Sequence, residues 1–176
     1  MKKSSILIIF ILVIMPLLVV GFLNFFGENR FDVMTYYQND SEQLPECVIN
    51  RSYPYQVDVS AYLEVKEEPT LFITSTFEKW SESERIQLAR LCDKIRGGNV
   101  ILIHSSEVSE PDCTSAVKLS RESIEDLSNC AFIMPMGMNM VLLDSKHGIR
   151  GYYQLSDGSD IDRAVVELDI LVMNKE

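Results

Sequence analysis

An uncharged apolar run near the N-terminus most constrains what this chain can fold into. Ile6 to Leu23 are eighteen consecutive residues without a charge. At about 1.5 Å of rise per residue, a helix of this length just spans a hydrocarbon core of about 30 Å. A cleaved signal peptide would normally have a shorter apolar region followed by small residues, and the stretch after Gly21 offers no such site. We therefore predict an uncleaved transmembrane helix over residues 6–23, with membrane lipid as its partner.

Flanking charges predict the orientation of this anchor. Lys2 and Lys3 precede the run, whereas Glu28, Arg30 and Asp32 follow it. The basic end is expected to stay in the cytoplasm. The prediction is a single-pass protein of the bacterial inner membrane, or of an equivalent energy-transducing membrane, with its domain in the periplasm or outer space.

The remaining length supports one globular domain. About 150 residues bury one hydrophobic core. We predict a cytoplasmic tip and anchor over residues 1–27, a stalk over 28–45, either free or lying against the domain, and a single domain over 46–176. The chain carries 26 acidic and 16 basic residues, which argues against nucleic acid as a partner because nucleic-acid binding needs clustered positive charge.

The clearest elements form a strand–helix–strand unit. Residues 70–75 and 99–104 are short β-favouring runs typical of buried strands. Between them, Ser81 and Glu84 form a capping-box pattern and Gly97-Gly98 ends the helix. The helix is predicted over residues 81–95, with an apolar stripe of Ile86, Leu88, Ala89, Leu91, Cys92 and Ile95. Such a unit normally makes a parallel strand pair.

The later elements complete an α/β pattern. Alternating apolar residues over 51–63 suggest an early strand or hairpin. A short helix over 121–129 precedes strands over 138–144 and 149–155, which a tight turn joins as an antiparallel pair. A helix over 160–173 closes the chain. This order predicts a thioredoxin-like domain, with a central mixed sheet flanked by helices.

The segment V-L-L-D-S-K-H-G-I-R-G-Y-Y, from Val141 to Tyr153, resembles the signature of the Sco/SenC family. These are membrane-anchored thioredoxin-fold proteins that handle copper during cytochrome c oxidase assembly. The resemblance covers about a dozen residues in detail and, by element order, residues 45–173. It implies the same fold and a role in a respiratory membrane complex.

This chain departs from the family at the residues that carry its chemistry. The family has a Cys-x-x-x-Cys motif after the first core strand and a distant His. The matching positions here are Thr76, Trp80 and Met136. Copper binding and disulfide exchange at that loop both need thiolate sulfur. We therefore expect a degenerate site, no enzymatic activity and no cofactor.

Four alternating methionines offer a weak alternative site. Met134, Met136, Met138 and Met140 would point to one side of an extended chain. Thioether sulfur suits Cu(I), so a methionine copper site is possible. The interpretation we favour is that they fill core space beside a strand. Pro135 within this segment is either a cis-proline or an ordinary trans proline that ends a loop, and the sequence does not decide between them.

Cysteine count and two aromatic residues leave further alternatives open. Cys47, Cys92, Cys113 and Cys130 are an even number, which in an oxidising compartment suggests disulfides of unknown pairing; for Cys92 a buried free thiol is the alternative. Phe77 and Trp80 either form a docking surface or pack into the core. His104 is expected to be structural, and His147 to lie in an exposed turn.

The function expected from these observations is that of a non-catalytic, membrane-anchored accessory factor or subunit of a respiratory complex such as a heme-copper oxidase. One alternative is a copper metallochaperone that uses the methionines. Another is a thiol–disulfide protein that uses the cysteines in a new arrangement.

Overall fold

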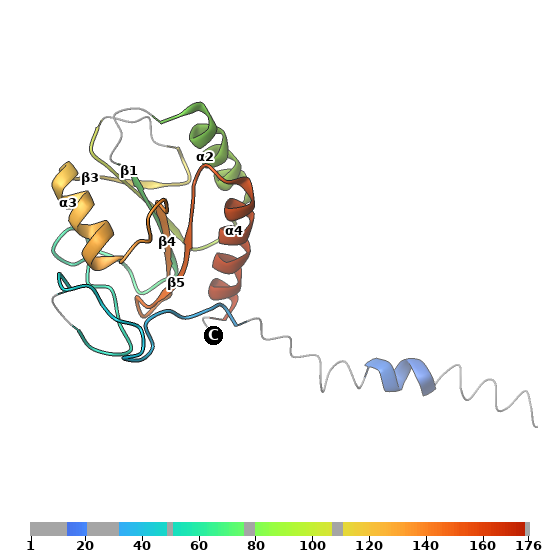
Figure 1. Ribbon diagram of the computed structural model, residues 1–176. Coiled ribbons are helices and arrows are strands. Elements are labelled where there is room, and N and C mark those ends of the chain that lie inside the picture. Colours follow the sequence, from blue (N-terminus) through green and yellow to red (C-terminus); the bar gives the residue numbers. More distant parts are fainter. Residues whose placement is uncertain (1–13, 21–31, 49–50, 76–79, 107–110, 175–176) are drawn as a thin grey trace, which may run out of the picture. The chain divides into compact units, whose positions relative to one another are not determined.

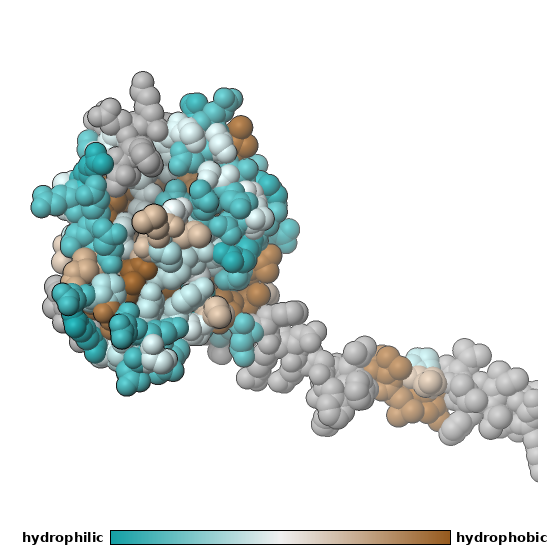
Figure 2. Space-filling model, in the orientation of Figure 1, coloured by the Kyte–Doolittle hydropathy of each residue, from teal (hydrophilic) through white to brown (hydrophobic). Residues whose placement is uncertain are grey.

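The computed structural model describes residues 14–20, 32–48, 51–75, 80–106 and 111–174. The chain forms two compact units, residues 1–32 and 33–176. In the first unit residues 14–20 are helical, and Figure 2 shows their apolar side chains exposed. The rest of the predicted span lies outside the described residues. Among those that are described, no helix combines the length and the apolar character that crossing a bilayer requires, so the anchor stays a prediction.

The second unit is built on one five-stranded sheet (Figure 1). Its strand order is β3-β2-β1-β4-β5. The first three strands in sequence are mutually parallel, whereas β4 is antiparallel to β1 and β5 is antiparallel to β4. The strand bounds are β1 Thr70–Ser75, β2 Asn99–His104, β3 Ser115–Lys118, β4 Met140–Leu143 and β5 Ile149–Tyr153. The predicted thioredoxin-like arrangement is confirmed by this topology.

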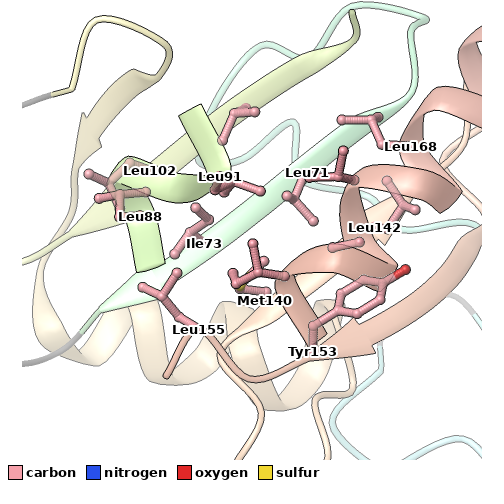
Figure 3. Packing of buried hydrophobic residues seen from close by; sticks show 14 of the residues in the cluster. Leu71, Ile73, Leu88, Leu91, Leu102, Met140, Leu142, Tyr153, Leu155 and Leu168 are labelled. Carbon is pink, nitrogen blue, oxygen red and sulfur yellow. The ribbon is translucent and has the colours of Figure 1, made fainter. Parts of the chain in front are cut away.

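Helices cover both faces of the sheet. The long helices α2 (Glu82–Lys94) and α4 (Gly158–Met173) lie together on one face, and α3 (Arg121–Asp126) with the π-helical turn η1 (Leu127–Ala131) covers the other. Figure 3 shows the core on the α2–α4 face, where leucines from both helices meet the inward side chains of β1 and β4. Alternate residues of β1 serve the two faces, so this strand is buried along its whole length.

Helix α2 begins as its sequence predicts. The Ser81 side chain accepts a hydrogen bond from the Glu84 amide at 3.2 Å, and the Glu84 carboxylate accepts one from the Ser81 amide at 2.8 Å. The predicted apolar stripe is only partly right. Leu88 and Leu91 are buried, but Ile86 is 59% exposed because the α2–sheet contact is narrower than the stripe.

The predicted strand over residues 51–63 is wrong, although its alternation is real. Tyr55, Val57 and Val59 are buried in the core on the α3 face. This segment makes isolated backbone bonds rather than a ladder: the Tyr55 amide donates to the Tyr37 carbonyl at 3.0 Å, and the Val57 amide donates to the His147 carbonyl at 2.9 Å. Burial on one side therefore produced the alternation without a neighbouring strand.

The compact unit begins at Val33, earlier than the predicted domain start at residue 46. Val33 is buried in the core on the α2–α4 face. The Tyr36 amide donates to the Ile149 carbonyl at 3.0 Å, and Arg150 donates to the Val33 carbonyl at 3.2 Å and to the Thr35 hydroxyl. We call residues 33–48 the N-terminal arm. The part of the predicted stalk that belongs to this arm is packed on the domain.

Candidate functional site

The end of β1 is where the sequence resemblance places a thiol motif. Thr74 and Ser75 are buried there, each 7% exposed. The Thr74 amide and hydroxyl both donate to the Asn139 carbonyl, at 2.9 Å and 3.3 Å. Thr76 and Phe77, which follow, lie outside the described residues. The described part of this strand end therefore has two buried hydroxyl side chains, of which that of Thr74 is hydrogen-bonded to the Asn139 carbonyl, and no cysteine.

Of the two alternatives predicted for Trp80, a docking surface or packing into the core, the structure has the second. Its side chain is 8% exposed and belongs to the core on the α2–α4 face. Its indole Nε1 is buried without a hydrogen-bond partner in the described parts of the chain. Trp80 packs into the core because it precedes α2 directly, on the side of the sheet that this helix covers.

The four methionines do not share one side. The Met138 amide donates to the Pro135 carbonyl at 3.1 Å, and Gly137 has a φ of +86°, so a turn interrupts the segment. Met140 is buried on the α2–α4 face, whereas Met134 and Met138 pack against the core on the opposite face. Met136 is fully exposed. The prediction of a site with four thioethers on one side of an extended segment is therefore wrong. Met134, Met138 and Met140 pack in or against the hydrophobic core, whereas Met136 does not.

The cis peptide bond found in the described residues precedes Pro54, not Pro135. Of the two alternatives for Pro135, the structure has the ordinary trans form. Sequence alone could not separate these two prolines, because both lie in loops.

Two disulfides use all four cysteines. Cys47 pairs with Cys130, and Cys92 pairs with Cys113. Cys92 is thus not a free thiol. The first bridge ties the end of the N-terminal arm to η1, and the second ties α2 to the segment that leads into β3. Neither bridge lies in the loop between β1 and α2.

The two histidines occupy different environments. His104, at the end of β2, is 4% exposed, and its Nδ1 is hydrogen-bonded to the Ser106 carbonyl, as a structural histidine should be. His147 lies in the β4–β5 turn with a φ of +64°. It is half-buried rather than exposed, and its buried Nε2 has no hydrogen-bond partner among the described residues. The prediction for His147 is wrong because the segment before β1 covers the turn.

His147 lines a cleft that sequence reasoning did not find. The cleft has a volume of about 580 Å³ and is lined by Asp58, Val59, Ser60, Leu63, Glu64, Val65, Lys66 and His147. The Ser60 hydroxyl and amide donate to Asp58 at 2.6 Å and 3.0 Å, and these bonds lower the pKa of that carboxyl. The alternating burial of Tyr55, Val57 and Val59 was the available signal that this segment lies against the domain.

A second, smaller cleft of about 220 Å³ borders the Cys47–Cys130 bridge. Tyr55 and Tyr62 contribute to its wall. The Tyr55 hydroxyl donates to the Ala131 carbonyl at 2.8 Å, and desolvation by burial, as the main cause, raises the pKa of Tyr55 to about 12. Within the described ranges no cluster of three His, Cys, Asp or Glu residues could hold a metal ion.

A partly buried ion pair at the β4–β5 turn positions the arginine that contacts the N-terminal arm. Asp144 directly follows β4 and accepts hydrogen bonds from the amides of Lys146 and Gly148, both at 2.8 Å. Its other carboxylate oxygen accepts from Arg150 Nε at 2.8 Å, with the two side chains 14% and 24% exposed. Arg150 also donates to the Val33 carbonyl. The D-S-K-H-G-I-R segment is therefore a tight turn that holds the arm.

Comparisons with known proteins find only distant similarities. No protein-family model matches this chain, and neither does any curated protein. Among solved structures, BsSco, described as a member of the Sco family of cytochrome c oxidase assembly proteins, is similar with a TM-score of 0.49 and 11% identity over 62% of this chain and 83% of its own. A SCO1/SenC family lipoprotein from Bacillus anthracis str. Ames has a TM-score of 0.47 and 10% identity, over 60% of this chain and 82% of its own. At this level of similarity, function has to be argued from the residues.

Proposed function

We propose that this chain is a non-catalytic, membrane-tethered thioredoxin-fold protein that acts as an accessory factor, or as a bound subunit, of a respiratory membrane complex of the heme-copper oxidase type. We propose that the chain is non-catalytic because of where its cysteines lie. All four cysteines are held in two bridges between separate elements, and the residues from Thr74 to Trp80 include no cysteine. Without a thiolate at the end of β1, a thioredoxin fold lacks its usual nucleophile and soft metal ligand.

The respiratory part rests on the sequence resemblance of Val141–Tyr153 to the Sco/SenC signature. In this chain the charged residues of that segment have a structural task, since Asp144 and Arg150 hold the N-terminal arm. The resemblance therefore supports a shared setting rather than a shared reaction.

The tether is supported by the apolar run and by its described portion. Residues 14–20 are helical, and Met15, Leu17, Leu18, Val19 and Val20 are each more than half exposed. Exposed apolar side chains on a continuous helix need an apolar environment. The charge pattern favours a cytoplasmic N-terminus and a periplasmic domain.

Thiol–disulfide exchange at Cys47–Cys130 is a second candidate. Cys47 is exposed, and the bridge borders the 220 Å³ cleft. An exposed disulfide can be attacked by a partner's thiolate. This candidate predicts that mild reductant opens one bridge selectively and that the reduced protein is reoxidised through a mixed disulfide.

One purification separates these candidates. The full chain is extracted from its native membrane with a gentle detergent, and the accompanying proteins, bound copper and thiol content are measured together. We expect an oxidase to co-purify, both bridges to survive mild reductant, and this chain, once separated from its partners, to carry no copper of its own. A solitary monomer that turns over thiols would contradict the proposal, as would one that retains copper.

A further inference from the structure

Tyr37 and Tyr55 lie side by side and fasten the chain to the domain at both places. The Tyr55 amide donates to the Tyr37 carbonyl at 3.0 Å, and the two rings meet edge to face with their centroids 6.2 Å apart. The Tyr36 amide is bonded in turn to the Ile149 carbonyl at 3.0 Å. We call residues 38–48, which follow Tyr37, the strap. In Figure 1 the strap belongs to the blue-to-cyan loop below α3.

The hydrogen bonds of the strap are local. The Glu42 amide donates to the Asn39 carbonyl at 3.3 Å, and the Glu42 carbonyl accepts from the Tyr53 hydroxyl at 2.7 Å. Among the described residues, each hydrogen bond of the strap ends on a residue between positions 36 and 53. These bonds shape the strap, but they do not hold it to the sheet or to α3.

Two apolar side chains and one disulfide join the strap to the body of the domain. Val48 is 5% exposed in the core on the α3 face, and Leu44 packs against that core. The Cys47–Cys130 bridge is the covalent link, and it ends in η1. Burial of two side chains opposes the conformational entropy that eleven residues gain on release. We therefore expect the strap to stay in place while the bridge is closed and to open locally without it.

The strap also forms one wall of the 220 Å³ cleft. Cys47 and Val48 line the cleft from the strap, and Cys130 lines it from η1. The disulfide therefore borders a space that a dissolved thiol can enter. Of the four cysteines, Cys47 is exposed and the other three are half-buried. Cys47 is thus the cysteine that a reductant reaches first.

Two tyrosines join the other walls of this cleft without the strap. The Tyr55 hydroxyl donates to the Ala131 carbonyl at 2.8 Å, and the Tyr62 hydroxyl donates to the Asp126 carboxylate. These bonds connect the segment before β1 to α3 and η1. Release of the strap would therefore widen the cleft into a groove and leave the rest of the fold connected.

The Cys92–Cys113 bridge has a different setting. Cys92 lies within α2, and Cys113 precedes β3. Helix α2 is fixed to the sheet by the buried side chains of Leu88 and Leu91. The position of α2 therefore does not depend on this bridge, which makes it an internal control for the other one.

We propose that the Cys47–Cys130 bridge is a redox switch for the strap: closed, it holds the strap beside the cleft, and reduction by a dithiol releases the strap. A thiolate of the dithiol attacks the Cys47 sulfur, a mixed disulfide forms, and Cys130 leaves as a thiolate that takes up a proton. The second thiol of the dithiol then attacks the mixed disulfide. The dithiol becomes a disulfide, and its two electrons and two protons end on Cys47 and Cys130.

A monothiol lacks the second step of this reaction. The tethered Cys130 thiol attacks the mixed disulfide and expels the monothiol, so the bridge closes again. This agrees with a bridge that survives mild reductant. One dithiol is consumed for each opening, so the switch is compatible with a non-catalytic protein, and it does not depend on the oxidase.

The test uses the purified full chain in detergent, titrated with dithiothreitol, alkylated with iodoacetamide and mapped by mass spectrometry. We expect Cys47 and Cys130 to be labelled at a dithiothreitol concentration about tenfold below that needed for Cys92 and Cys113. Once the first bridge is open, a protease specific for glutamate should cut the strap after Glu42 and Glu46 about tenfold faster. The cooperative thermal transition should persist.

Two double variants complete the test. Cys47→Ser with Cys130→Ser should show the fast strap cleavage without reductant. Cys92→Ser with Cys113→Ser, the matched control, should keep slow cleavage until dithiothreitol is added. Earlier opening of the Cys92–Cys113 bridge would overturn the inference, as would strap cleavage that is the same with the Cys47–Cys130 bridge open and closed. Loss of the thermal transition on opening Cys47–Cys130 would also overturn it, because that bridge would then hold the whole domain.

Discussion

Single residues in the β4–β5 turn explain why this short segment has a recognisable pattern. The Asp144 carboxylate accepts hydrogen bonds from two backbone amides and pairs with the Arg150 guanidinium. Arg150 in turn donates a hydrogen bond to the Val33 carbonyl. This geometry requires an aspartate side chain, a tight turn and an arginine guanidinium at a fixed spacing along the chain. The sequence displays this spacing, but it does not reveal that the partner is a residue more than one hundred positions away.

Replacing Arg150 with Met should destabilise the domain by about 2 kcal/mol, because the half-buried Asp144 carboxylate loses its charged partner and the Val33 carbonyl loses a donor. Urea unfolding measures the change. Arg121→Met is the matched control: its pair with Glu125 is 73% and 53% exposed, so its loss should cost less than about 0.5 kcal/mol. Equal effects of the two substitutions would contradict the assigned role.

Buried tyrosines should make the domain sensitive to alkali. Desolvation raises the pKa of Tyr55 to about 12, and it also raises the pKa values of Tyr152 and Tyr153. Since the folded pKa lies above the unfolded value of 10.0, this stabilisation is complete below pH 10 and is lost as pH rises from 10 toward 12.

The urea midpoint should therefore be constant from pH 8 to 10 and should fall between pH 10 and 12, together with the appearance of tyrosinate absorbance. Tyr55→Phe removes one of the titrating groups, so its midpoint should fall less steeply in the same range. An unchanged midpoint up to pH 11.5 would show that these hydroxyls are not desolvated in the folded state.

At the scale of elements, local signals were sufficient for those with their own caps and apolar runs. The strand–helix–strand unit from Thr70 to His104 and the antiparallel pair β4–β5 formed as predicted, within a few residues at each end. Strand β3 was missed because Ser115–Lys118 is short and only half-buried, and it exists by pairing with β2. The segment over residues 51–63 shows the opposite case, an alternating pattern without a ladder.

The capping box of α2 can be tested directly. Ser81→Ala removes the side-chain acceptor for the Glu84 amide and should destabilise the domain by about 1 kcal/mol. Ser83→Ala, two residues on and exposed, should be close to neutral. Both variants are compared by urea unfolding, and a larger loss for Ser83 would show that the cap contributes little.

At the scale of the whole molecule, the arm changes where the domain starts. Val33 lies in the core on the α2–α4 face, Tyr36 is bonded to β5, and Cys47 is bridged to Cys130. The arm therefore belongs to the folded unit.

Two truncated chains should separate these boundaries. Residues 33–176 should fold cooperatively, whereas residues 46–176 should be less stable by about 3–5 kcal/mol, because the Val33 burial and the Arg150 and Tyr36 hydrogen bonds are lost. Both retain the four cysteines, so the disulfides are the same in each. Equal stability in thermal and urea unfolding would place the start of the domain at residue 46.

The amino-acid sequence by itself determined the anchor prediction, the order of the main elements and the absence of cysteine from the loop after β1. These depend on local properties: apolar runs, caps, turns and residue identity. Only the tertiary structure decided which cysteines pair, that Trp80 packs inside, that the four methionines separate and that His147 lines a cleft. Each of these depends on contacts between residues far apart in the chain, and local periodicity carries no information about which distant surface will cover a given side chain.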